Sequence, residues 1–172
     1  ILFSAIKELG GDVDVYIPFR ETEGYGLNLD AVDYIVKNGV KLVATVDCGV
    51  SNAPEISELK KNGIDVVVTD HHEEPLELPK DAFCIINPSL KNERYPFKYL
   101  AGCGVAFKVA KDIIKKHQDY KVKKLKPGWE KWLLDLVAIG TITDLMPLLG
   151  ENRTLVKYGI LVLQKTQRLG IQ

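Results

Sequence analysis

The stretch LVATVDCGVSNAPEISELKKNGIDVVVTDHH, residues 42–72, constrains the fold more than any other part of the chain. Residues 42–46 and 65–69 are short apolar runs rich in β-branched side chains, and residues 53–62 between them have helical spacing. This order predicts two parallel strands joined by a helical crossover, which brings the carboxyl ends of both strands to one edge of the sheet. Open α/β sheets bind their ligands at that edge.

Polar residues follow both predicted strands. Asp47 ends the first strand, and Asp70, His71 and His72 follow the second. Neighbouring strands lie about 4.8 Å apart, so these distant parts of the sequence can reach one small ion or phosphate. By itself, Asp47 is also typical of a turn or helix cap, and the two histidines are typical of a solvated loop. Carboxylate and imidazole together at two strand ends favour a metal site.

Length and charge limit the class of protein. With 172 residues and 46% hydrophobic content, the chain predicts one globular domain with one sizeable core. The formal net charge is zero, so any contact with nucleic acid requires a local basic patch. The lysine-rich stretch 111–131 is more typical of a solvated helix end and loop than of a DNA-backbone contact.

The cysteines and the hydropathy indicate the compartment. Cys48, Cys84 and Cys103 form no CxxC pair, which favours reduced thiols of a cytoplasmic protein over a disulfide framework or a zinc ribbon. No apolar run approaches the roughly 20 residues of a membrane span, and we expect no membrane partner.

The remaining pattern completes an α/β fold with a mainly parallel sheet, helices on both faces and a helical C-terminal part. The further strands are expected at 13–17 and 83–86, and the further helices at 1–9, 29–38, 102–117, 129–139 and 154–164. The helix at 129–139 should pack on the sheet through Trp132, Leu133, Leu136 and Val137.

Several polar residues have open interpretations. Asn52 and Glu55 match a capping box at the start of a helix. Asp144 has apolar neighbours and would be costly to bury alone, so a cation or hydrogen-bond donors should meet it.

Three residues are candidates for contact with a phosphate. Gly102 and Gly104 begin a helix, where free N–H groups suit an anion, although tight packing explains the glycines equally well. Arg20 could bind a phosphate or form an ion pair with Glu21 or Glu23.

Four blocks of sequence carry a resemblance to a known family. They are TVDCGVSN with VVVTDHH, IPFRETEGYGLN at 17–28, IINPSLKNERYPFKYLAGCGVAFKVA at 85–110, and GTITDLMPLLGENRTLVKYG at 140–159. In this order they are similar to the RecJ-like single-strand exonucleases of the DHH phosphoesterase superfamily. The three letters DHH are a weak signal, but four long blocks that span nearly the whole chain are specific.

The resemblance implies a function and a set of site residues. It implies metal-dependent hydrolysis of phosphodiester bonds, as 5′ to 3′ degradation of single-stranded DNA in repair and recombination, with two Mn2+ or Mg2+ ions. Asp47, His71 and Asp144 would bind metal, and Asp47 would bridge the two ions. His72 would contact the phosphate or support the metal site, and Asp70 would orient the histidines.

The resemblance also implies the domain organisation. We expect a DHH domain that lacks the aspartate motif of its first strand, which would precede Ile1, and lacks the second substrate-binding domain. Such a piece alone should be nearly inactive. Single-stranded DNA is the expected partner, and protein partners in DNA repair cannot be read from the sequence.

Three alternatives remain open at this point. They are a DHH phosphodiesterase that cleaves short oligonucleotides or cyclic dinucleotides, a non-catalytic RecJ-like replication scaffold, and a metal-free nucleotide-binding α/β module.

Overall fold

A computed structural model describes residues 1–117 and 125–172. Residues 118–124, in the middle of the lysine-rich stretch, lie outside the described residues. The rest forms two compact units: a sheet unit, Tyr16–Lys98, and a helical unit, Ile1–Val15 with Tyr99–Gln172. Each unit has its own hydrophobic cluster, whereas the composition predicts one core. The difference arises because the helices after residue 101 bury their apolar faces mainly on one another and on the first helix.

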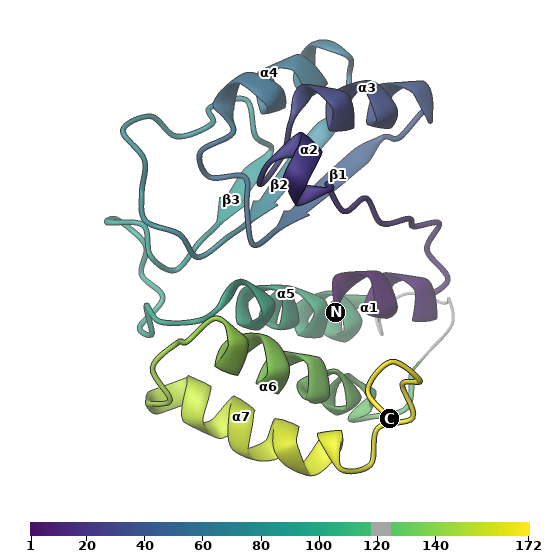
Figure 1. The fold of residues 1–172 in the computed structure, drawn as a ribbon, viewed down its shortest axis with the longest axis vertical. Coiled ribbons are helices and arrows are strands. Elements are labelled where there is room, and N and C mark those ends of the chain that lie inside the picture. The colour runs from purple at the N-terminus through teal and green to yellow at the C-terminus, as the bar shows by residue number, and fades with distance from the viewer. Residues whose placement is uncertain (118–124) are drawn as a thin grey trace. The chain divides into compact units, whose positions relative to one another are not determined.

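The sheet unit is an α/β structure (Figure 1). Its elements are α2 (Arg20–Glu23), α3 (Leu29–Lys37), β1 (Leu42–Val46), α4 (Ala53–Lys61), β2 (Asp65–Thr69) and β3 (Cys84–Ile86). All three strands are parallel in the order β1-β2-β3, as the sequence predicts. The register pairs Leu42 with Asp65 and Val46 with Thr69, so β1 and β2 end side by side.

Helices α3 and α4 flank the sheet because their apolar sides meet it in one cluster. Ile35 of α3 and Ile56 of α4 are buried together with Val66 and Val68 of β2. The helix starts are defined locally: the side chain of Asn28 accepts the N–H of Ala31, which caps α3. These helices hold β1 and β2 in place and leave the carboxyl ends of the strands to carry the polar residues.

The segment 13–17 is not a strand, so that prediction is wrong. Strands require a partner for their backbone groups, and Val15 donates its N–H to the neighbouring Asp14 side chain instead. Val15 and Ile17 are 49% and 82% exposed, so the apolar pattern of the segment does not correspond to burial here.

The described residues of the helical unit form five elements. They are α1 (Leu2–Glu8), α5 (Gly102–His117), the 3-10 helix η1 (Trp129–Leu133), α6 (Leu134–Thr143) and α7 (Gly150–Leu163). Its core joins the buried faces of α1, α5 and α6, with Ala5, Ala110 and Val137 fully buried. Gly159 of α7 permits close packing on α6, since a Cβ there would lie 2.3 Å from the carbonyl oxygen of Leu134.

The region 129–139 differs from its predicted packing. Leu133 and Val137 are buried in the helical cluster, Leu136 is half-buried, and Trp132 is 52% exposed. The first turn is a 3-10 helix, which advances three residues per turn instead of 3.6 and rotates Trp132 away from the α-helical face. Trp129 packs against the cluster instead.

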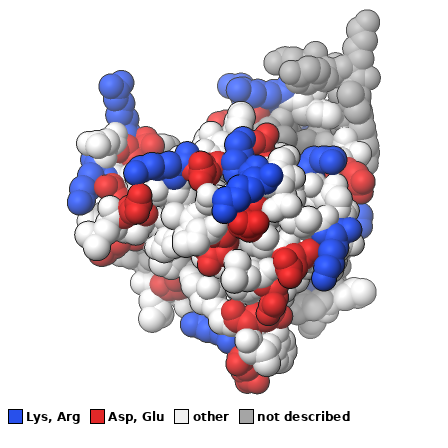
Figure 2. All heavy atoms as spheres, turned by 90° about the horizontal axis from the view of Figure 1, so that it is seen from above, with Lys and Arg blue, Asp and Glu red and all other residues white. Residues whose placement is uncertain are grey.

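The surface carries mixed charge. On the face that Figure 2 draws, Lys and Arg side chains are interspersed with Asp and Glu among the described residues. The described residues on this face therefore form no basic stripe of the kind that follows a phosphate backbone. None of the described helices has the length and hydropathy needed to cross a bilayer.

Candidate metal centre

The site begins where β1 and β2 end. The N–H of Asp47 donates to the carbonyl of Thr69 at 3.0 Å, and the N–H of Asp70 donates to the carbonyl of Ile86 at 3.0 Å. The parallel ladder thus continues one residue beyond each strand. It places Asp47 beside the Asp70-His71-His72 segment, as the sequence predicts.

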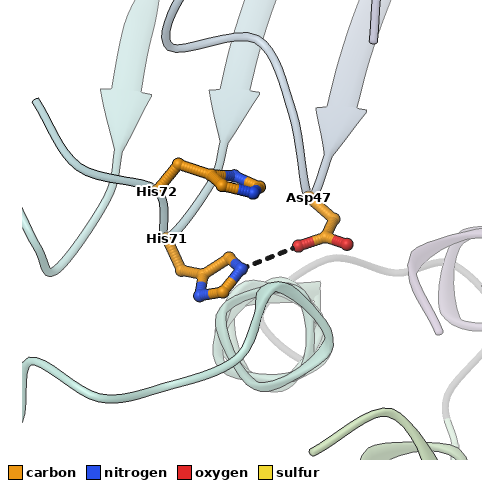
Figure 3. Close-up of side chains that lie close together, drawn as sticks. All are labelled: Asp47, His71 and His72. Carbon is orange, nitrogen blue, oxygen red and sulfur yellow. Dashed lines mark ion pairs between the residues drawn. The ribbon is translucent and has the colours of Figure 1, made fainter. Parts of the chain in front are cut away.

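Asp47, His71 and His72 form a cluster of ligating atoms. Each residue offers one such atom, and these atoms lie within 4.8 Å of one another. Nε2 of His71 lies 3.1 Å from Oδ1 of Asp47, and both atoms are shielded from solvent. Figure 3 shows the carboxylate directed at the His71 ring, with the His72 ring above the His71 ring on the same side of Asp47. The Asp47 side chain remains 49% exposed, so the cluster is open to solvent on one side.

Asp70 lies behind this cluster with its side chain 1% exposed. Its Oδ2 accepts the N–H of Val50 at 3.0 Å. Its Oδ1 accepts the N–H of His71 at 2.7 Å and of His72 at 3.2 Å, and contacts Nδ1 of His72 at 2.6 Å. Burial alone would raise the pKa of Asp70, but the hydrogen bonds from Val50, His72 and His71 lower the pKa below its usual value. Asp70 is therefore an ionised anchor for both histidines.

Asp47 has a left-handed backbone conformation, with φ of 64°. Non-glycine residues adopt this region rarely, and they persist there when neighbouring contacts over-determine it. The turn that follows depends on Gly49, which has φ of 110° and whose added Cβ would lie 2.5 Å from Oγ1 of Thr45. That hydroxyl donates to the carbonyl of Cys48 at 2.8 Å and closes the turn.

Cys48 is not a good metal ligand despite its position after Asp47. Burial is the main cause that raises the pKa of its thiol to about 11, and the negative charge of Asp70 adds to the effect. Metals bind the thiolate form, so the cluster offers oxygen and nitrogen rather than sulfur. All three cysteines are free thiols.

Two further residues near the cluster were not identified as site residues from the sequence. Asn87 is 1% exposed, and its Nδ2 donates to the carbonyl of His72 at 2.8 Å. The hydroxyl of Tyr25 donates to the carbonyl of Asp47, and its ring meets the His72 ring edge-on at 5.8 Å. The two glycines of Gly24-Tyr25-Gly26 are the sequence signal for a close approach at this loop.

Arg20 lies in the same unit as the cluster. Its guanidinium carbon is 5.8 Å from the centre of the Tyr25 ring, a cation–π distance. Glu23, one of its two expected partners, accepts instead from the hydroxyl of Tyr16. Contact of Arg20 with a phosphate stays a prediction.

Asp144, Gly102 and Gly104 belong to the helical unit. Asp144 is the C-cap residue of α6 and is exposed, as is Leu145 after it, which is 89% exposed. The expectation that a cation or hydrogen-bond donors meet Asp144 stays a prediction. The convergence of Asp144 with Asp47 and His71 stays a prediction.

The two glycines lie at the start of α5 and are buried. A Cβ at Gly104 would meet the side chain of Leu100 at 3.2 Å, which is a packing reason for glycine at this position. Anion binding at Gly102 and Gly104 stays a prediction.

The donor set fits a divalent cation. One carboxylate and two imidazoles within 4.8 Å match the oxygen and nitrogen ligation of Mn2+, whereas Mg2+ prefers oxygen alone. The fold and this cluster together define an α/β domain with a candidate metal site at two parallel strand ends. The family model for the DHH family, N-terminal domain, matches residues 1–141. The chain therefore belongs to the DHH family.

Individual relatives agree with this family. The chain is 42% identical over 172 residues to the single-stranded-DNA-specific exonuclease RecJ of Bacillus subtilis (strain 168), covering 100% of the chain and 20% of that relative. A crystal structure of exonuclease RecJ bound to manganese is 34% identical, with a TM-score of 0.84, and the match covers 99% of this chain and 41% of that one. RecJ in complex with Mn2+ from Thermus thermophilus is 30% identical, with a TM-score of 0.77 and coverage of 99% and 23%. The chain thus spans a fraction of the length of its relatives.

Proposed function

We propose that this chain is the metal-binding part of an exonuclease that hydrolyses phosphodiester bonds of single-stranded DNA in the 5′ to 3′ direction during repair and recombination. The observation that carries the proposal is the cluster of Asp47, His71 and His72 at two parallel strand ends. The likeness to RecJ relatives over the whole chain supports the substrate class.

Manganese is the metal that the donor set fits best, and magnesium is the alternative. Asp47 and His71 would hold the ion, with Asp144 as the third ligand and Asp47 as the residue shared with a second ion. A bound divalent ion in such a site lowers the pKa of a water molecule and neutralises charge on the phosphate. The side chains around the ion would bind and position the substrate phosphate.

His72 is suited to the substrate phosphate. Nδ1 faces the ionised Asp70, so this nitrogen carries the proton and Nε2 is directed away from the anchor. The His72 side chain is 46% exposed, so its Nε2 would donate to a phosphate oxygen in the doubly protonated ring and would face a metal ion as a ligand in the neutral ring. Asp70 thereby acts through His71 and His72, because its hydrogen bonds fix both backbone amides.

Arg20 and the α5 start would contact other phosphates of the strand. Arg20 is exposed beside Tyr25, where its charge can meet an anion without loss of a buried partner. Gly102 would offer its backbone N–H at the start of a 16-residue helix, whereas the N–H of Gly104 already donates to the carbonyl of Ala101 at 2.8 Å.

The test is nucleotide release from single-stranded DNA labelled at either end. It should be run with this 172-residue chain and with a longer chain that includes the flanking parts of its reading frame. We expect manganese-dependent release from the 5′ end in the extended chain, and a loss of about 10³-fold in Asp47→Ala. Unchanged activity in Asp47→Ala would refute the proposed site. Preferential cleavage of cyclic dinucleotides or of very short oligonucleotides would refute the proposed substrate.

A further inference from the structure

We propose that Tyr25 is a positioning residue, which holds the left-handed backbone of Asp47 and thereby aims the Asp47 carboxylate at His71. The inference rests on the proposed metal-dependent function and assigns the loop Gly24–Asn28 a role in it.

The peptide groups on both sides of Asp47 are held by hydrogen bonds. Its N–H donates to the carbonyl of Thr69, and its own carbonyl accepts the hydroxyl of Tyr25. A left-handed conformation at a non-glycine residue is disfavoured, so it needs such contacts to persist. The first contact belongs to the sheet ladder. The second comes from a side chain 22 positions earlier in the sequence.

The Tyr25 loop is itself fixed to the turn that follows Asp47. Nδ2 of Asn52 donates to the carbonyl of Leu27 at 2.8 Å, and Oδ1 of Asn52 accepts the N–H of Leu27 at 3.4 Å. Asn52 makes no side-chain cap on α4, so the predicted capping box is wrong and the side chain serves this bridge instead. Gly26 has φ of 84°, and a Cβ there would lie 3.0 Å from Oδ1 of Asn52. The bridge therefore depends on glycine at this position.

A backbone hydrogen bond also connects Asn52 to the turn after Asp47. The N–H of Asn52 donates to the carbonyl of Gly49 at 3.0 Å, two residues after Asp47. Tyr25, Leu27, Asn52 and the turn at Asp47 thus form a closed ring of contacts. Displacement of the Tyr25 loop would move the end of β1, and the Asp47 carboxylate would move with it.

The role of the Tyr25 hydroxyl can be tested separately from the role of the Tyr25 ring. The ring lies edge-on to His72 at 5.8 Å and carries Arg20 over its face, and neither contact uses the oxygen. Tyr25→Phe therefore keeps the ring packing and removes the bond to the Asp47 carbonyl. Because that bond acts on a backbone conformation, its loss should change the geometry of Asp47 even without a metal.

Two measurements test the inference. The three-bond coupling between HN and Hα of Asp47 reports its φ directly by NMR in the metal-free chain. Manganese affinity by calorimetry reports the consequence, and we expect Tyr25→Phe to weaken it about 10-fold, as for other residues that orient a metal ligand. Tyr16→Phe is the matched control, since the hydroxyl of Tyr16 donates to Glu23 in the same unit.

The outcomes separate this inference from the proposed function. A changed Asp47 coupling in Tyr25→Phe, with Tyr16→Phe unchanged, supports the positioning role. An unchanged coupling in Tyr25→Phe, or an equal change in Tyr16→Phe, overturns it. Failure of the unsubstituted chain and of the extended chain to bind manganese would overturn the proposed function, whichever result the coupling gives.

Discussion

Oδ1 of Asp70 lies 2.6 Å from Nδ1 of His72, and the side chain of Asp70 is 1% exposed. An ionised carboxylate at this distance requires the proton on Nδ1, so the neutral ring keeps Nε2 as an acceptor or ligand. A buried anion thus selects the tautomer of an exposed histidine. The DHH triplet is one structural unit, in which the aspartate supports the two histidines that would bind the proposed metal and substrate.

Replacement of Asp70 by asparagine should destabilise the fold. An amide cannot accept all of the N–H groups that meet this carboxylate, and its own NH2 would face the N–H of either Val50 or His72. We expect a loss of about 2–4 kcal/mol in the free energy of unfolding, measured by urea titration. Asp65→Asn is the control, because the Asp65 pair with Lys60 is exposed and should contribute less than about 1 kcal/mol. Equal losses in the two variants would contradict the anchoring role.

Acid should lower the stability of the metal-free chain by protonating Asp70. The pKa of Asp70 is lower in the folded chain than its usual value of 3.8, which it regains on unfolding. The carboxylate therefore contributes its full stability above the unfolded pKa, and this contribution is lost as the pH falls through the folded pKa. The difference in urea midpoint between the natural chain and Asp70→Asn should be constant above about pH 5 and should shrink below it. A difference that stays constant down to acidic pH would contradict the ionised state.

The sequence predicts the sheet and its edge well because local and long-range signals agree there. Strands 42–46 and 65–69 match β1 and β2 at both ends, and Asp47 meets His71 as expected. The segment 13–17 fails because alternation indicates a strand only when another strand pairs with it. The bridge from Asn52 to Leu27 could not be predicted, since it depends on how a loop 25 positions away packs and not on helix capping.

Asp47→Gly should lower the manganese affinity without lowering the free energy of unfolding. Glycine adopts φ of 64° without strain, so the variant should unfold with a free energy equal to that of the natural chain or up to about 1 kcal/mol higher. Manganese affinity should nevertheless fall by at least about 10-fold, because the carboxylate is gone. Asp47→Ala should lose the same affinity and be less stable than Asp47→Gly. Retained manganese binding in both variants would remove Asp47 from the site.

Gly49→Ala should be strongly destabilising. The added methyl would lie 2.5 Å from Oγ1 of Thr45 and would break the turn between β1 and α4, at a backbone φ of 110°. We expect a loss of about 3 kcal/mol or more from the clash and the backbone strain together. Gly63→Ala is the matched control, since Gly63 has φ of 74° with nothing within 4 Å and should lose only about 1 kcal/mol. Thermal unfolding of both variants measures the difference, and equal losses would show that the contact with Thr45 relaxes freely.

Asp144→Asn tests whether the helical unit supplies a metal ligand. Asp144 is exposed at the end of α6, so the substitution should change the free energy of unfolding by less than about 0.5 kcal/mol. If Asp144 shares an ion with Asp47, manganese affinity should fall by about 10-fold or more in Asp144→Asn. The effects of Asp47→Asn and Asp144→Asn on affinity should also be non-additive, because both would act on one ion.

Asp112→Asn, on the exposed side of α5, is the control for a general loss of negative charge. Calorimetric titration with manganese of the natural chain, the three single variants and the double variant decides the matter. An affinity in Asp144→Asn equal to that in Asp112→Asn would exclude Asp144 from the ligand set and leave Asp47, His71 and His72 as the site.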